Sequence, residues 1–342
     1  MIRVEDVSAS YFTPAGPVQA VDHVSLTIRD DEVLGIAGES GCGKSTLIKV
    51  IYQFLEPPLR LLSGNVEATA RGAGGEPVIL DGPALRRAWW RYISYIPQGS
   101  MSVLNPVARV GPQFLDAAGA SAAFASRAEL DARIAGYLGE LNLPVDVLRA
   151  YPHQLSGGMR QRVIVALATF LHPRVILADE PTTALDVVVQ RGIITMLGEL
   201  QARERNTLVV VSHDMGVHYQ LASRLAIMYA GKLVELAEMS ALVDRPLHPY
   251  TALLIGSLPR VGDRARREGI GGRPPRLLDP PPGCRFAPRC PQKMAVCERV
   301  DPPVQELTPG HWVACHLHAE PGDGLPGHAA ASHAPATPGT AA

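Results

Sequence analysis

The residues with the clearest chemistry form a glycine-rich loop at positions 38–45. They are Gly38, Glu39, Ser40, Gly41, Cys42, Gly43, Lys44 and Ser45, and Thr46 follows them directly. Backbone N–H groups of such a turn point at a bound anion, and the positive end of the following helix adds to their field. Lys44 would reach the β- and γ-phosphates of a nucleotide, and the Ser45 hydroxyl would bind the bridging Mg²⁺. The loop lies between an apolar run and an amphipathic segment, which favours a phosphate-binding loop over a chance match.

Four further polar residues each stand at the end of a short apolar run: Gln98, Asp179, Glu180 and His213. Open α/β sheets gather ligand groups at the carboxyl ends of their strands, so we expect these side chains beside the loop. Asp179 would hold Mg²⁺, and Glu180 would face the γ-phosphate and an attacking water. The Gln98 amide would bind the metal or a water, and His213 would hydrogen-bond the γ-phosphate. A lone histidine after a strand is otherwise usually an ordinary loop residue.

Two other groups are ambiguous by themselves. Ser156, Gly157 and Gly158 open a helical pattern with little side-chain cover, which suits either an anion or an ordinary capped turn. Tyr11 follows a strand-like segment and would either stack on adenine or pack as a half-buried strand residue.

Four of the five cysteines gather near the C-terminal end with the spacing C-x5-C-x6-C-x17-C. They are Cys284, Cys290, Cys297 and Cys315. Buried structural thiols usually lie in an apolar core, whereas these cysteines have the charged neighbours Arg285 and Arg289. The cysteines are therefore interpreted as metal ligands rather than as free structural thiols. Structural zinc sites commonly use close Cys-x2-4-Cys pairs, which are missing here, whereas iron–sulfur sites accept varied loops and often a proline beside a ligand. The spacing favours iron, and zinc stays open.

Length and composition limit the class of protein. A chain of 342 residues with 46% hydrophobic content is large enough for a core domain with an appendage. The net charge is −1 without a basic run, so nothing indicates a nucleic-acid partner. No apolar run approaches the roughly 18 residues that cross a bilayer, and the N-terminus lacks the pattern of a signal peptide, so we expect a cytoplasmic chain.

The elements that position these residues follow from apolar periodicity. We expect buried strands at 33–37, 93–96, 175–178 and 207–211, an edge strand at 2–7, a strand at 21–28 and a last strand at 232–235. We expect helices from the phosphate loop to 55, at 110–117 and 128–141, from the Ser-Gly-Gly turn to 171, after 186 and at 251–258. Residues 64–80 are interpreted as a loop with a short strand, because glycines interrupt them.

In order, spacing and chemistry, residues 1–320 resemble the nucleotide-binding subunits of ATP-binding cassette (ABC) transporters. The resemblance implies an α/β P-loop NTPase fold, with a mixed sheet and a helical subdomain at about 99–158 inserted in a 1–240 nucleotide-binding domain. A small Cys/Pro-rich accessory domain at 241–320 and a disordered tail at 321–342 would follow. The implied roles are adenine stacking for Tyr11, metal sensing for Gln98, the signature for residues 155–158, the catalytic carboxylate for Glu180, the inter-subunit loop for Asp186 and the switch for His213.

Within this family, Met159, residues 103–107 and residues 248–250 resemble oligopeptide and dipeptide importers. Some of these importers carry a four-iron cluster in the region that matches the four cysteines, so the resemblance implies a structural [4Fe-4S] cluster here. Cys42, where serine is frequent, and residues 97–100 depart from the family pattern without removing a catalytic group.

The resemblance also implies partners. Two ATPase subunits would pack head to tail around two ATP, with Ser156, Gly157 and Gly158 of one chain covering the nucleotide of the other. The second ATPase is expected to be a related chain, and the complex would include two membrane permeases and an extracytoplasmic substrate-binding protein. The ATPase would then lie at the cytoplasmic face of the membrane. Nickel chelates, glutathione or sugars are alternative cargoes to peptides.

Two functions from other classes fit less well. Soluble cassette ATPases of DNA repair or translation carry long coiled-coil insertions or two cassettes, and neither is present. A purely regulatory nucleotide-binding subunit would lack a catalytic group, whereas Glu180 and His213 are both present.

Overall fold

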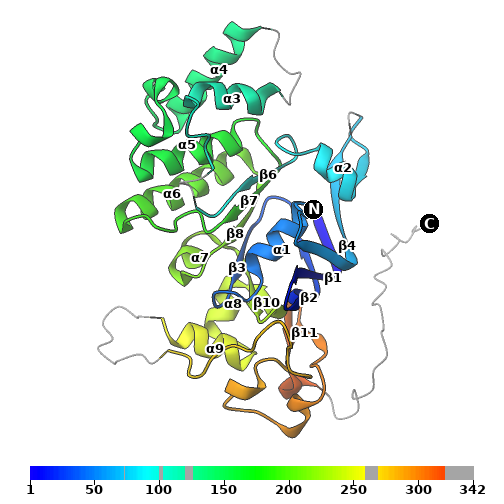
Figure 1. Cartoon of the computed structure of the whole chain (residues 1–342). Coiled ribbons are helices and arrows are strands. Elements are labelled where there is room, and N and C mark those ends of the chain that lie inside the picture. Colours follow the sequence, from blue (N-terminus) through cyan, green and yellow to red (C-terminus); the bar gives the residue numbers. More distant parts are fainter. Residues whose placement is uncertain (73, 100–102, 120–125, 259–268, 320–342) are drawn as a thin grey trace, which may run out of the picture.

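The computed structural model describes residues 1–72, 74–99, 103–119, 126–258 and 269–319, which form two sheets with helices around them (Figure 1). The larger sheet has the order β11-β12-β10-β9-β3-β8-β7-β6, and the smaller sheet has the order β2-β1-β4-β5. The larger sheet consists of β3 (Val33–Ala37), β6 (Ile93–Ile96), β7 (Val175–Asp179), β8 (Thr207–Val211), β9 (Arg224–Tyr229), β10 (Lys232–Glu238), β11 (Val304–Thr308) and β12 (His311–Ala314). The smaller sheet consists of β1 (Ile2–Thr13), β2 (Gly16–Ile28), β4 (Leu59–Arg71) and β5 (Pro77–Leu80).

The helices are α1 (Lys44–Ile51), α2 (Gly82–Arg87), α3 (Val110–Gly119), α4 (Arg127–Glu140), α5 (Gly157–Thr169), α6 (Val187–Glu204), α7 (Met215–Leu221), α8 (Met239–Asp244) and α9 (Pro249–Gly256). Within the described ranges, none of them is long and apolar enough to cross a membrane.

The centre of the larger sheet is parallel and buried, as predicted for the four apolar runs. Strands β9, β3, β8, β7 and β6 pair in parallel, and every residue of β3, β7 and β8 is buried. Alternate residues face two different cores: Ile176 and Val210 join the helices α3–α6, while Leu177 and Val211 join α1 and the smaller sheet. Burial on both faces explains why these strands are almost entirely apolar, and the predicted positions of the four apolar runs are confirmed.

The smaller sheet differs from the prediction in two places. The expected edge strand is wrong, because β1 pairs with both β2 and β4 and its alternation reflects one solvated face. The expected loop with a short strand at 64–80 is wrong in its first half, because β4 continues to Arg71, whereas a short strand, β5, is present at Pro77–Leu80. Gly64 has a φ of +83°, and a Cβ there would lie 2.3 Å from the Asp6 carbonyl oxygen, so this glycine permits close strand packing at an irregularity.

The C-terminal region contributes strands that the sequence did not reveal. Strand β12 pairs antiparallel with β10, with Val313 opposite Glu235, and β11 pairs with β12. The predicted last strand is therefore followed by two more, and the predicted boundary near residue 240 falls between strands of one sheet. Helix α1 ends at Ile51, earlier than expected, because Gln53 has a φ of +61°. The predicted disordered tail at 321–342 lies outside the described residues.

A buried carboxylate joins this region to the sheet. Glu235 on β10 is 1% exposed and accepts hydrogen bonds from the backbone N–H groups of Leu247 (2.8 Å) and His248 (2.9 Å). The His311 Nε2 on β12 lies 2.7 Å from the same carboxylate. His248 Nδ1 accepts the N–H of Tyr250 (3.0 Å) and so caps α9. Burial, with a smaller contribution from His318, lowers the pKa of His248 to about 3.

We expect His248→Asn to flatten the pH dependence of stability. Below about pH 6.5 the unfolded chain binds a proton at His248 that the folded chain refuses, so the free energy of unfolding falls as the pH falls. Urea unfolding at pH 7 and pH 5 should show that the wild-type chain loses about 2 kcal/mol more than the variant, at about 1.4 kcal/mol per pH unit. Asparagine keeps an N-cap acceptor, so equal losses in the two proteins would contradict a buried neutral His248.

Candidate nucleotide-binding site

The phosphate loop joins β3 to α1 and packs closely against two other strands. Gly38 and Gly43 have φ values of +148° and +105°, which side chains rarely allow. A Cβ at Gly38 would lie 2.1 Å from the Met228 carbonyl oxygen on β9, and one at Gly43 would lie 2.0 Å from the Ala20 carbonyl oxygen on β2. The two glycines are therefore required by backbone packing as well as by the approach of a ligand.

Lys44 lies inside this loop. Its Nζ donates hydrogen bonds to the carbonyl oxygens of Gly38 (2.8 Å) and Glu39 (3.0 Å), and the residue is 5% exposed. No ion pair of Lys44 with a carboxylate is found among the described residues, so its charge is available to a phosphate. Cys42 is buried beside it, and burial raises the pKa of this thiol, which therefore stays protonated at neutral pH.

Ser45 and Asp179 meet at the end of β7. The Ser45 hydroxyl donates to Asp179 Oδ1 (2.8 Å), and the Tyr95 hydroxyl donates to Asp179 Oδ2 (3.0 Å). Burial raises the pKa of Asp179 despite these two hydrogen bonds, so a cation beside it would favour the ionised form. A hydroxyl and a carboxylate are ligands that suit Mg²⁺, and the pair therefore fits the predicted ion. Tyr95 was not predicted, since nothing in the sequence distinguishes it from strand packing.

Glu180 lies just beyond β7 and contacts three polar side chains. Its carboxylate accepts hydrogen bonds from Gln98 Nε2 (2.9 Å) and the Thr183 hydroxyl (2.7 Å), and His213 Nδ1 lies 3.3 Å away. Glu180 has a φ of +47° and lies one residue beyond the end of β7, so the direction of its side chain does not follow strand alternation. Burial acts to raise the pKa of Glu180, but the contacts with Thr183 and His213 outweigh it and hold the pKa below its usual value. The carboxylate is therefore ionised at neutral pH and can orient a water.

Tyr11 and Glu39 touch the loop in different ways. The Thr46 hydroxyl donates to the Tyr11 hydroxyl (3.3 Å), and the half-buried Tyr11 ring packs against the core beneath α1. Adenine stacking by Tyr11 remains a prediction. Arg289 donates hydrogen bonds to both oxygens of the Glu39 carboxylate at 2.8 Å. Arg289 was not predicted as part of this site.

The second glycine-rich helix start is not brought to the loop. Ser156 caps α5 by accepting the N–H of Met159 (3.2 Å), and α5 lies among α3, α4 and α6, apart from α1 (Figure 1). A Cβ at Gly158 would lie 2.6 Å from a methyl group of Val189, so packing against α6 also requires this glycine. Asp186 caps α6 by accepting the N–H of Val189 (2.9 Å).

The four C-terminal cysteines lie near one another as free thiols. Burial raises the pKa of Cys284 and of Cys315 to about 11, and neighbouring thiols, Cys290 and Cys297, contribute to both shifts. The Cys284 N–H also donates to the Cys297 carbonyl oxygen (2.8 Å). In the described part of the chain, however, no three histidine, cysteine or acidic side chains are placed to hold a metal ion. As positioned here, the thiols do not form a closed ligand set.

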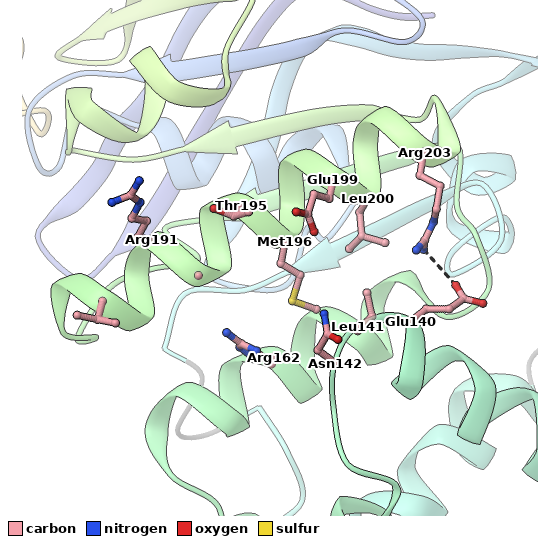
Figure 2. Close-up of a pocket in the computed structure, with 12 residues that line it drawn as sticks. Glu140, Leu141, Asn142, Arg162, Arg191, Thr195, Met196, Glu199, Leu200 and Arg203 are labelled. Atoms are coloured by element: carbon pink, nitrogen blue, oxygen red, sulfur yellow. Dashed lines mark ion pairs between the residues drawn. The ribbon is translucent and has the colours of Figure 1, made fainter.

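A cavity of about 460 Å³ lies elsewhere, between α6, α5 and the end of α4 (Figure 2). Figure 2 shows Arg203 directed from α6 toward Glu140, and these partly exposed groups are 3.3 Å apart. No residue of the phosphate loop lines this cavity, so it is not the nucleotide site. An exposed ion pair of this kind adds little stability.

The fold and the loop define a P-loop nucleotide-binding domain of the ABC class. Residues 21–183 match the family model described as ABC transporter, and residues 234–297 match that of the oligopeptide/dipeptide transporter, C-terminal region. In structure, the chain is similar to the dimeric bacterial ABC transporter cassette MJ0796, with a TM-score of 0.60 and 27% identity over 70% of this chain and 99% of that chain.

Similar proteins of known name indicate which group of ABC proteins the chain belongs to. The chain is 41% identical to the dipeptide transport ATP-binding protein DppD of Caldanaerobacter subterraneus, over 94% of this chain and 98% of the relative. It is 37% identical to DppD of Bacillus subtilis, over 93% and 94% of the two chains. It is 36% identical to the oligopeptide transport ATP-binding protein OppD of Salmonella typhimurium, over 94% of both chains. The chain belongs to the oligopeptide/dipeptide group of ABC transporter ATP-binding proteins.

We expect Lys44→Ala to weaken ATP binding by about 10- to 100-fold, since a charge-assisted hydrogen bond to phosphate contributes about 1.5–3 kcal/mol. Isothermal titration of the full chain with ATP and Mg²⁺ measures this directly. Lys293→Ala is the matched control, because Lys293 pairs with Glu298 on the surface. Unchanged affinity in Lys44→Ala would remove Lys44 from the phosphate site.

Proposed function

We propose that this chain is the ATP-hydrolysing subunit that powers an ABC importer of dipeptides or oligopeptides. The main structural support is the sheet edge where Ser45 meets Asp179 and where Gln98 and His213 meet Glu180. The relatives named as dipeptide and oligopeptide transport proteins align over almost the whole chain, which supports peptides as the cargo. A nickel, glutathione or sugar importer of the same group is the alternative.

The residues divide the work of hydrolysis in this proposal. The loop N–H groups and Lys44 bind the phosphates, and Ser45 and Asp179 hold Mg²⁺, which would offset the phosphate charge. The ionised Glu180 orients a water and accepts its proton during attack on the γ-phosphate. Gln98 and His213 fix the Glu180 carboxylate, so both would act on the position of the water.

The dimer belongs to the same proposal. Ser156, Gly157 and Gly158 lie apart from the phosphate loop of their own chain, as expected if they cover a nucleotide bound by a second chain (Figure 1). Exposed Val187 and Val188 follow Asp186, and apolar side chains at such a position suit an interface. The second ATPase would be a related chain, and both would bind two permeases at the cytoplasmic face of the membrane, with an extracytoplasmic substrate-binding protein completing the importer.

We expect Glu180→Gln to bind ATP but to hydrolyse it at least about 100-fold more slowly, the usual effect of losing a general base. Phosphate release by the purified importer measures turnover, and titration measures binding. Glu199→Gln, on the exposed face of α6, is the control and should keep wild-type turnover. Wild-type turnover in Glu180→Gln would exclude Glu180 as the base.

The four cysteines carry a separate proposal, a structural [4Fe-4S] cluster, with zinc as the alternative. Their mutual proximity supports it, and binding would have to draw the thiols closer than they lie here. Protein purified anaerobically should be brown and contain iron and sulfide, and Cys290→Ser should lose both. Cys42→Ser, which changes the remaining cysteine in the phosphate loop, should keep the iron. Colourless protein with one zinc per chain would reject the cluster.

A further inference from the structure

Arg289 makes an unusually complete set of contacts for a residue outside the predicted site. All five N–H donors of its guanidinium are used, and the side chain is only 4% exposed. Nη1 donates to Glu39 Oε2 (2.8 Å) and the Tyr229 hydroxyl (3.1 Å), and Nη2 donates to Glu39 Oε1 (2.8 Å) and the Ile270 carbonyl oxygen (3.0 Å). Nε donates to the Gly271 carbonyl oxygen (2.8 Å). A fork-to-fork pair of this kind is geometrically specific.

The same region also holds the backbone of Glu39. The Glu39 N–H donates to the Tyr250 hydroxyl (2.9 Å), and Tyr250 is fully buried. Its ring packs against Tyr229 and Phe286, with centroids 4.7 Å and 5.3 Å apart. Glu39 is therefore fixed at both its side chain and its main chain by residues that follow β9.

The position of Glu39 matters for the phosphates. It lies between Gly38 and Ser40 in the loop, and its carbonyl oxygen accepts a hydrogen bond from Lys44. A carboxylate in an anion-binding loop repels phosphate unless a cation offsets it. Arg289 neutralises this carboxylate and holds both of its oxygens.

We propose that Arg289 is a positioning residue of the nucleotide site, which compensates Glu39 and fixes the phosphate loop so that tight ATP binding depends on the C-terminal region. This inference rests on the proposed function of the chain as an ATPase. Arg289 does not touch the nucleotide in this proposal and acts only through Glu39.

Arg285 provides a matched control in the same region. It is similarly buried, at 6% exposure, and its Nη2 donates to Asp22 Oδ2 and Gln19 Oε1, both at 2.7 Å. It therefore anchors the region to β2 without contacting the phosphate loop. Replacing either arginine should loosen the C-terminal region, whereas only the replacement of Arg289 should weaken ATP binding.

The test is a double-mutant cycle of Arg289→Met and Glu39→Gln in the full chain, with ATP affinity measured by titration and folding checked by circular dichroism. Arg289→Met should weaken ATP binding at least about 10-fold, the scale of a lost charge-assisted contact. The double variant should bind within about 3-fold of Glu39→Gln alone, since the uncompensated carboxylate is then gone. Arg285→Met should bind ATP like the wild-type chain.

Three results would overturn the inference: wild-type affinity in Arg289→Met, multiplied losses in the double variant, or an equal loss in Arg285→Met. If Arg289→Met does not fold, two milder variants make the same test. Arg289→Lys keeps the charge without the fork, and Tyr250→Phe removes only the acceptor for the Glu39 N–H. Each should weaken ATP binding, and wild-type affinity in both overturns the inference. If the wild-type chain bound no ATP, the proposed function itself would fail, independently of Arg289.

Discussion

The structure depends on the close backbone contact between the phosphate loop and the strands on either side of it. Gly38 and Gly43 leave no room for a side chain against the carbonyl oxygens of Met228 on β9 and Ala20 on β2. The loop can therefore pack against a strand from each sheet only because neither position carries a side chain. This contact ties the smaller sheet to the larger one at the point where the nucleotide would bind, so site and fold are stabilised together.

How much of the fold the sequence reveals depends on burial. The strands at the buried parallel centre of the larger sheet are almost entirely apolar, so β3, β6, β7 and β8 were predicted at nearly their observed bounds. Strands with a solvated face were harder to predict. Gly64 suggested that β4 ends there, and the alternation of apolar and polar residues in β1 is also typical of an edge strand. Strand β11 is mostly exposed and gives almost no apolar signal. Its place depends on pairing with β12, which a sequence pattern does not encode.

In the candidate site, too, the sequence predicts some features and not others. Motif spacing and strand ends predicted that Ser45, Asp179, Gln98 and His213 lie close together, and the structure brings them to one sheet edge. The direction of their contacts was not predictable, because the left-handed backbone of Glu180 turns its carboxylate toward the other side chains. The pair between Glu39 and Arg289 joins residues 250 positions apart, so only the tertiary fold reveals it.

The late position of β12 in the chain bears on biosynthesis. Strand β10 is complete at Glu238, but its partner begins only at His311, so the ribosome must add all the intervening residues before the sheet can close. Until then β10 has an open edge, and the Glu235 carboxylate lacks His311. Open strand edges on a nascent chain invite pairing with other chains. The growing polypeptide therefore passes through an interval in which the edge of β10 is exposed to such pairing, and this interval ends only when β12 has been synthesised.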